Sequence, residues 1–202
     1  APYSTMYNPD TLHLLPGYLD QPIPFDTQAN GTPVDYSTIT ESEMRSIMAA
    51  YYGMITEIDD GIGSIIQKLK EKGLYDNTII VFTSDHGEYL GYHHMILKCN
   101  HLYDPLAKIP LLIKYPQQQF CGNIDPSLSL LRKKRRNYVF SEGQYGTEQS
   151  PNIGYMFRSD SYKLLVRGSF KNAVLYDLKK DPYEQHNVAH LSEYQEILKE
   201  FQ

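Results

Sequence analysis

The sequence has no tryptophan, only two cysteines and no run of 18 apolar residues among its 202 residues. Two cysteines are too few for a disulfide framework or a cysteine-based metal cluster, although one bridge between Cys99 and Cys121 stays open. The missing apolar run excludes a membrane-spanning helix, so no membrane partner is expected. The first four residues lack the charged and apolar regions of a signal peptide, which leaves the compartment unknown.

An excess of positive charge is also missing, since the net charge is -5. An acidic chain has no general attraction to nucleic acid. The one basic run, Arg132–Arg136, has no interleaved aromatic residues and is typical of a solvated loop. We therefore expect no nucleic-acid partner. The hydrophobic fraction of 41% and the charged fraction of 21% indicate a globular protein with one or two domains.

The most informative segment is Thr78–Glu88, in which a continuous apolar run ends in Ser-Asp-His-Gly. A strand buried on both faces shows this continuous pattern rather than an alternation. Ligands of open α/β sheets bind beyond the carboxyl ends of such strands. Asp85 and His86 are therefore candidates for binding a metal or a phosphate-like group, and a strand-to-loop corner capped by Asp85 is the alternative.

A long helix is predicted to begin after Thr40, because Thr40–Glu43 has the spacing of a capping box. An apolar stripe at helical spacing runs from Met44 to Leu69, and Gly73 supplies a stop. One face of this helix is expected to pack on a sheet. Asp59 and Asp60 lie within it and diverge by about 100°, so they are expected to be surface or packing residues rather than a metal pair.

The pattern predicts an α/β fold, with part of a mixed sheet flanked by helices and a small C-terminal antiparallel sheet closed by a terminal helix. Residues 1–36 read as an extended wrapping segment of a first domain, 1–136, whose second strand is expected within Ile109–Tyr115. A C-terminal subdomain, 137–202, is expected to contain short strands, two hairpin turns and a helix from Ser192 to Phe201.

Several segments in this order resemble the sulfatase family of the alkaline-phosphatase-like superfamily. They are Tyr51–Gly63, Gly73–Glu88, Lys98 with Leu102–Asp104, Ile109–Ile113, Arg158–Leu165 and Leu175–Glu184. The resemblance implies a sulfuric ester hydrolase acting on a sulfated small molecule or glycan. It also implies a secreted, periplasmic or lysosomal location, or a cytoplasmic one in bacteria. The oligomeric state stays open.

The resemblance assigns roles to three residues. Asp85 and His86 match two ligands of a divalent cation, for which calcium is the first expectation, with manganese or magnesium next. Lys98 matches the catalytic lysine that contacts the sulfate and stabilises charge on the leaving oxygen. His93 lies where relatives often have Gly-Asp-His-Gly, here Gly91–His94, so its role is in doubt, and His101 reads as a polar loop residue.

Three features depart from the family pattern. The formylglycine signature is absent, because Cys99 and Cys121 are not followed by the required Pro and Arg. The N-terminal acidic pair of the cation site is also absent, and the stretch 117–137 is short. The chain thus resembles the C-terminal portion of a sulfatase, with formylglycine expected in the N-terminal part, and is expected to be inactive alone. A phosphonate or phosphate ester hydrolase of the same superfamily and a non-catalytic binding remnant are the alternatives.

Overall fold

The computed structural model describes residues 2–23, 26, 36–98, 101–118, 138–147 and 150–201. The chain divides into two compact units. Unit 1 comprises Ala1–Gln21, Asp35–Lys98 and Pro105–Gly122, and unit 2 comprises Pro22–Val34, Cys99–Asp104 and Asn123–Gln202. Both cysteines and the basic run Arg132–Arg136 lie outside the described residues.

Unit 1 is built on a long helix, α2 (Glu41–Glu71), which begins and ends at the predicted signals. The Thr40 hydroxyl accepts the backbone N–H of Glu43, and the Glu43 carboxylate accepts the backbone N–H of Thr40. Gly73 ends the helix with a φ of +67°, which a side chain would disfavour. The capping box therefore forms, as predicted. Among the described residues, no helix is long and apolar enough to cross a bilayer.

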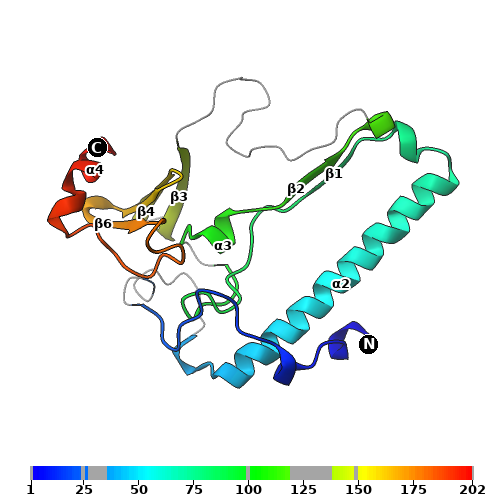
Figure 1. The fold of residues 1–202 in the computed structure, drawn as a ribbon, viewed down its shortest axis with the longest axis horizontal. Coiled ribbons are helices and arrows are strands. Elements are labelled where there is room, and N and C mark those ends of the chain that lie inside the picture. Colours follow the sequence, from blue (N-terminus) through cyan, green and yellow to red (C-terminus); the bar gives the residue numbers. More distant parts are fainter. Residues whose placement is uncertain are drawn as a thin grey trace. The chain divides into compact units, whose positions relative to one another are not determined.

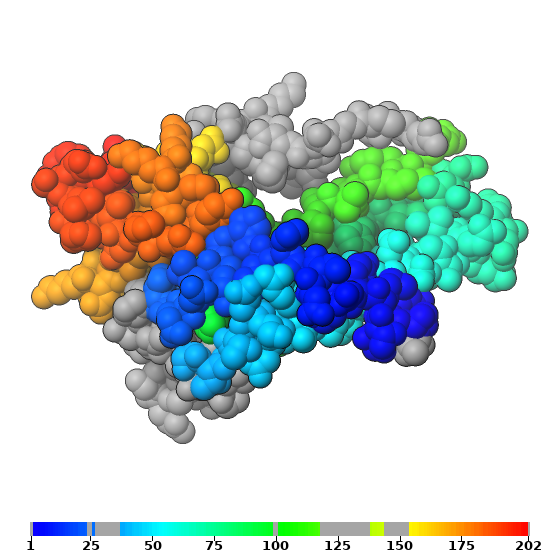
Figure 2. Space-filling view, turned by 60° about the horizontal axis from the view of Figure 1, so that its bottom comes forward, coloured from blue at the N-terminus to red at the C-terminus, as the bar shows by residue number. Residues whose placement is uncertain are grey.

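The described N-terminal residues lie along the first half of α2. It contains two short 3-10 helices, η1 (Tyr3–Thr5) and η2 (Pro9–Thr11), and both contact α2. Figure 2 shows this blue segment against the cyan helix. Gly53 permits the contact, since a Cβ atom there would lie 2.2 Å from the carbonyl oxygen of Tyr3.

The core of unit 1 covers only the first turns of α2. Met44 and Met48 are fully buried there and form a cluster with Leu90. Further along, Ile58 and Ile65 expose 58% and 65% of their surface. The expectation that one face of the helix packs on a sheet is therefore wrong for its second half within the described chain. Asp59 and Asp60 are exposed, as expected.

After the 3-10 turn η4 (Tyr75–Asn77), the chain forms strand β1 (Ile80–Thr83). This strand pairs with β2 (Leu111–Lys114) in a two-stranded antiparallel sheet, with Ile80 opposite Lys114. Another 3-10 turn, η5 (Pro116–Gln118), follows β2, and η3 (Tyr36–Thr38) precedes α2. In Figure 1, α2 and the two strands form two arms that meet near η4.

The expected burial of the central strand on both faces is wrong for this chain. Val81 and Phe82 expose 55% and 40% of their surface, and the partner strand is antiparallel rather than parallel. The reason is that the described residues supply only one neighbouring strand and no covering layer for β1. The apolar composition of β1 suits a strand that is covered on both faces, but the described residues do not cover it.

Unit 2 is a four-stranded antiparallel sheet in the order β3–β4–β5–β6, as predicted. The strands are β3 (Val139–Thr147), β4 (Ser150–Arg158), β5 (Tyr162–Arg167) and β6 (Ser169–Asp177). The turn η6 (Ser192–Tyr194) and the helix α4 (Gln195–Glu200) follow the sheet. Leu164, Leu175 and Tyr194 form its core with residues of α4. The predicted antiparallel sheet and terminal helix are thus confirmed.

A buried ion cluster connects Asp104 to strands β4 and β5 of this sheet. Lys163 is fully buried, and its Nζ lies 2.6 Å from Asp104 Oδ1 and 2.6 Å from Glu184 Oε1. Arg158 donates two hydrogen bonds of 3.0 Å to the two oxygens of Asp104, the residue at which α3 (Asp104–Ala107) begins. Two cations thus compensate two carboxylates, which a buried ionic group requires.

Candidate cation and oxyanion site

Asp85 and His86 follow β1 directly, at the position predicted for ligand-binding residues. The backbone N–H of His86 donates to Asp85 Oδ1 at 2.9 Å, and Ser84 Oγ donates to the carbonyl oxygen of His86 at 2.7 Å. These local bonds hold the turn at the end of the strand. The Asp85 side chain is 84% exposed and therefore accessible to an ion from solvent.

Gly87 lies in close backbone contact with Pro105 and Leu106, where only glycine fits. Its backbone N–H donates to the carbonyl oxygen of Leu106 at 2.9 Å. A Cβ atom at this position would lie 1.9 Å from the carbonyl oxygen of Pro105, which is too close for any side chain. Gly87 therefore allows the backbone next to His86 to pack directly against the residues before β2.

The His86 ring has the protonation pattern of a metal ligand. Its Nδ1 lies 2.8 Å from the carbonyl oxygen of Gly87. Because a carbonyl oxygen can only accept, we assign the proton to Nδ1, and the neutral ring then has its lone pair on Nε2. Such a backbone contact is the usual way in which a ligating histidine is oriented.

The two candidate ligands fit one cation. His86 Nε2 lies 3.6 Å from Asp85 Oδ2. Ligand bonds of about 2.1–2.4 Å place two donors on one ion roughly 3–4 Å apart. Within the described residues, no group of three or more His, Cys, Asp or Glu side chains gathers around a common point. Asp85 and His86 therefore make up a pair of donors rather than a closed metal site.

Lys98 lies within electrostatic range of this pair. The pKa of Asp85 is held below its ordinary value, first by the hydrogen bond from the His86 N–H, then by the positive charge that the His86 ring carries when both of its nitrogens are protonated, and also by the charge of Lys98. Lys98 is itself exposed. The structure thus brings Asp85 and His86 together and places a cationic side chain in their neighbourhood, in unit 1.

The loop between Glu88 and Lys98 has an unusual backbone. Leu90, His93, His94 and Leu97 have positive φ values of 45°, 50°, 65° and 62°, although none is glycine. His94 is buried and its Nδ1 lies 2.9 Å from the carbonyl oxygen of Leu19. Residues in this conformation cluster at functional sites, where surrounding contacts hold them. The loop that leads to Lys98 is thus strained.

His101, expected to be a polar loop residue, is buried in unit 2. Its Nδ1 lies 3.4 Å from Asp26 Oδ1, and it contacts Arg167. Tyr103 donates to the same Asp26 oxygen at 2.7 Å and lies 3.0 Å from the hydroxyl of Tyr176. His101 does lie outside the helices and strands, as expected of a loop residue, but its burial was not predicted. No local pattern in the sequence predicts the burial of His101, because its partner Asp26 is far away along the chain.

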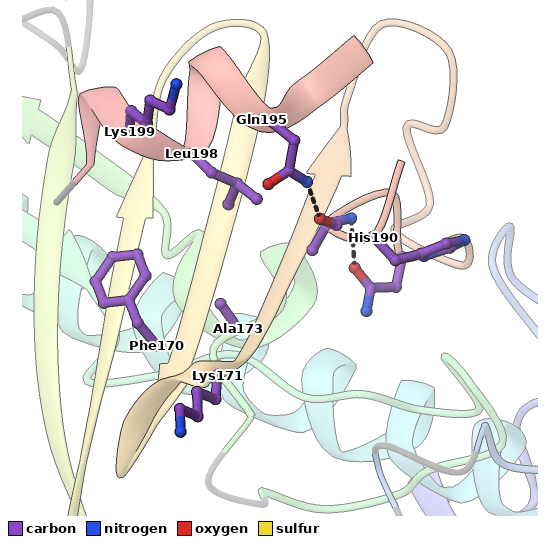
Figure 3. Close-up of a pocket in the computed structure, with 9 residues that line it drawn as sticks. Phe170, Lys171, Ala173, His190, Gln195, Leu198 and Lys199 are labelled. Atoms are coloured by element: carbon purple, nitrogen blue, oxygen red, sulfur yellow. Dashed lines mark hydrogen bonds between the residues drawn. The ribbon is translucent and has the colours of Figure 1, made fainter. Parts of the chain in front are cut away.

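A separate cavity of about 440 Å³ lies in unit 2 beside α4. Figure 3 shows that the Lys171 and Lys199 side chains on its border point in opposite directions. His190 and Gln195 also line it, and Gln195 is bonded to the backbone of Ala189. Because its charged groups do not converge, this cavity is a weaker candidate for an anion site than the Asp85 region.

The family model described as Sulfatase matches residues 18–129, which is more than half of the chain. The chain belongs to the sulfatase family. It is also similar to the multifunctional alkaline phosphatase superfamily protein PehA of Trinickia caryophylli, with 38% identity over 146 residues. That match covers 64% of this chain and 28% of PehA. The predicted family is therefore confirmed.

Solved structures of sulfatase-like proteins share the fold of this sulfatase-family chain. The phosphonate monoester hydrolase of Silicibacter pomeroyi matches with a TM-score of 0.79 and 27% identity, covering 100% of this chain and 51% of that protein. BT1596, a 2-O GAG sulfatase, matches with a TM-score of 0.66 and 26% identity, covering 80% and 42%. The chain thus spans about half the length of these structures or less, and 28% of PehA.

Proposed function

We propose that this chain supplies cation ligands and an anion-binding lysine to an ester hydrolase of the sulfatase family. The carrying observation is the pairing of Asp85 and His86, whose donor atoms lie 3.6 Å apart at the end of β1. Both residues would hold a divalent cation, with calcium first and manganese or magnesium next. When bound, the cation would neutralise negative charge on the oxygens of the substrate.

The remaining chemistry of this chain is assigned to Lys98. An ammonium group donates hydrogen bonds to the oxygens of a tetrahedral anion and stabilises charge that develops on a leaving oxygen. Because Lys98 is exposed and already influences Asp85, it can face an anion placed beside the same cation. We infer a sulfate ester of a small molecule or glycan as substrate, which the likeness to a GAG sulfatase supports.

The nucleophile is proposed to be formylglycine supplied from outside this chain, since neither Cys99 nor Cys121 stands in the required sequence context. The 202-residue chain is then expected to bind a cation and an anion but not to turn over an aryl sulfate. Hydrolysis of an aryl sulfate by the purified chain, abolished by Asp85→Ala, would contradict this proposal.

Cation binding is tested by isothermal titration calorimetry of the chain with calcium chloride. With two protein donors and solvent completing the shell, we expect a dissociation constant on the order of 10⁻³ M, the weak end of the calcium range. Asp85→Asn should abolish this binding. Asp76→Asn, a change at an exposed aspartate in η4, is the matched control and should leave it unchanged. Equal binding by the Asp85→Asn variant would refute the assignment.

A phosphonate or phosphate ester hydrolase is the second candidate, and one observation favours it. The phosphonate monoester hydrolase matches the whole chain at a TM-score of 0.79, against 0.66 for the GAG sulfatase. Titrating the calcium-loaded chain with phenyl phosphonate and phenyl sulfate discriminates between the two, and tighter binding of the phosphonate would favour this candidate.

A further inference from the structure

The cavity beside α4 in unit 2, which we call the α4 cavity, has the composition of a ligand site. Its volume of about 440 Å³ falls within the range of about 300–1,000 Å³ that ligand pockets occupy. Phe170, Ala173 and Leu198 give it an apolar lining. The described lining residues also include two lysines and a histidine, but no aspartate or glutamate. The cavity therefore favours a ligand that has both apolar surface and negative charge.

The α4 cavity is separate from the buried polar network of unit 2. Side chains alternate between the two faces of a sheet along a strand. Ala173 and Leu175 of β6 therefore share the face on which Leu198 of α4 packs, and Tyr176 points to the other face. The hydroxyl of Tyr176 lies 3.0 Å from that of Tyr103, so this network and the cavity occupy opposite faces of the sheet.

Two amide side chains of the cavity are held in defined orientations. Asn187 Oδ1 accepts the backbone N–H groups of Leu175 at 3.1 Å and Ala189 at 2.9 Å. Gln195 Nε2 donates to the carbonyl oxygens of Ala189 at 2.9 Å and Leu191 at 3.2 Å. Because each amide has a donor end and an acceptor end, Asn187 offers its NH₂ group to a ligand and Gln195 offers its oxygen. Hydroxyl groups, which both donate and accept, can bond to both.

The two lysines on the border suit an extended anion rather than a compact one. In Figure 3, Phe170 lies between Lys199 on α4 and Lys171 on β6, and the two lysine side chains point in opposite directions. Cations that do not converge cannot share one small anion, but a chain with spaced negative groups can contact each of them. Lys199 lies 2.6 Å from Glu196, and both side chains are exposed, so this weak pair can be exchanged for a ligand.

We propose that the α4 cavity is a second binding site, which takes a linear anionic glycan. One sugar ring occupies the cavity, and acidic groups of the neighbouring sugars pair with Lys171 and Lys199. The apolar C–H face of the ring packs on Phe170, and the ring hydroxyls bond to the two amides. The choice of a glycan over an acidic peptide rests on the proposed function, which includes a sulfated glycan as substrate.

The test follows the amide NMR spectrum of the 202-residue chain during titration with a chondroitin 4-sulfate hexasaccharide. Shifts should concentrate at the amides of Ala173, Ala189 and Leu198, with a dissociation constant below about 1 mM. Lys171→Gln and Lys199→Gln should each weaken binding roughly two- to fivefold, because each removes one exposed ion pair with the glycan. Added sodium chloride should weaken binding as well, since it screens these pairs.

Two control variants make the result specific. Lys179→Gln makes the same charge change at an exposed residue of unit 2 that does not line the cavity, and should leave the affinity unchanged. Asp85→Asn removes a proposed cation ligand of unit 1 and should leave the shifts at the cavity unchanged. Loss of calcium binding with retained glycan binding therefore separates a failure of the proposed function from a failure of this site.

Several results would overturn the inference. One is the absence of shifts at the cavity, and another is a Lys179→Gln variant that binds as weakly as Lys171→Gln. Equally tight binding of chitohexaose, which is uncharged, would refute the role of the lysines. Tighter binding of a hexaglutamate peptide would assign the cavity to an acidic protein segment instead.

Discussion

Replacing Lys163 by methionine tests the buried ion cluster of unit 2. Methionine has a similar length and no charge, so the change removes the cation that lies 2.6 Å from both Asp104 and Glu184. Arg158 still compensates Asp104 through its two hydrogen bonds, but Glu184, which is fully buried, loses its cation. Removing one partner of a buried ion pair costs about 3–5 kcal/mol.

This cost is a large part of the stability of an ordinary domain, which is about 5–15 kcal/mol. Hydrogen exchange of the amides in β5 measures it for unit 2 alone, because protection there reports the unfolding of the sheet. A loss of about 3–5 kcal/mol corresponds to exchange that is roughly 10²- to 4 × 10³-fold faster. Leu164 and Val166 are buried in that strand and suitable as reporters.

Two further variants make the result interpretable. Lys199→Met removes a surface ion pair with Glu196, in which both side chains are more than 60% exposed, and should cost at most about 0.5 kcal/mol. Adding Glu184→Gln to Lys163→Met neutralises the carboxylate that has lost the charge of Lys163 and should recover about 1–3 kcal/mol. If Lys163→Met cost no more than Lys199→Met, the assumption that the cluster excludes solvent would be refuted.

Three other predictions concern the loop, the turn and the buried tyrosines. Leu97→Gly should raise the free energy of unfolding measured in urea by about 0.5–1 kcal/mol, because glycine adopts the φ of 62° without strain and the leucine side chain is half-exposed. Leu97→Ala keeps a side chain at this φ and should not raise the free energy of unfolding. Gly87→Ala should cost about 1–3 kcal/mol, because its Cβ would lie 1.9 Å from the Pro105 oxygen, and a stability equal to the original would contradict this contact. Burial raises the pKa of Tyr103 and Tyr176 far above 10.0. Their contribution to stability is therefore present below the unfolded pKa and is lost at higher pH, so their absorbance at 295 nm should change only together with the loss of circular dichroism.

Local signals in the sequence predicted elements whose stabilising contacts are themselves local. The Thr40–Glu43 capping box and the Gly73 stop bound α2 as expected. The turn residues between β4, β5 and β6 likewise fixed a sheet of nearest neighbours in the chain. The capping partners lie three residues apart, and the paired strands follow one another in the chain with only short turns between them, so local spacing carries the information.

Burial could not be predicted in the same way, because it depends on residues far apart in the chain. Val81 is apolar and was expected to be buried, but within the described chain it has no covering layer. His101 was expected to be a polar loop residue, and nothing in the sequence indicated that it is buried beside Asp26 and Tyr103. Composition indicates the environment that a side chain favours, whereas the fold decides which distant groups provide it.

In the loop before Lys98, the sequence departs from the family pattern at a residue with a left-handed backbone. The sequence lacks the second glycine of the Gly-Asp-His-Gly pattern, and His94 stands in its place with a φ of 65°. A left-handed residue other than glycine costs about 1–2 kcal/mol, so surrounding contacts must hold it there. Burial of His94 and its contact with the Leu19 carbonyl provide them. The backbone from Glu88 to Lys98 thus keeps a conformation that runs against its local preference.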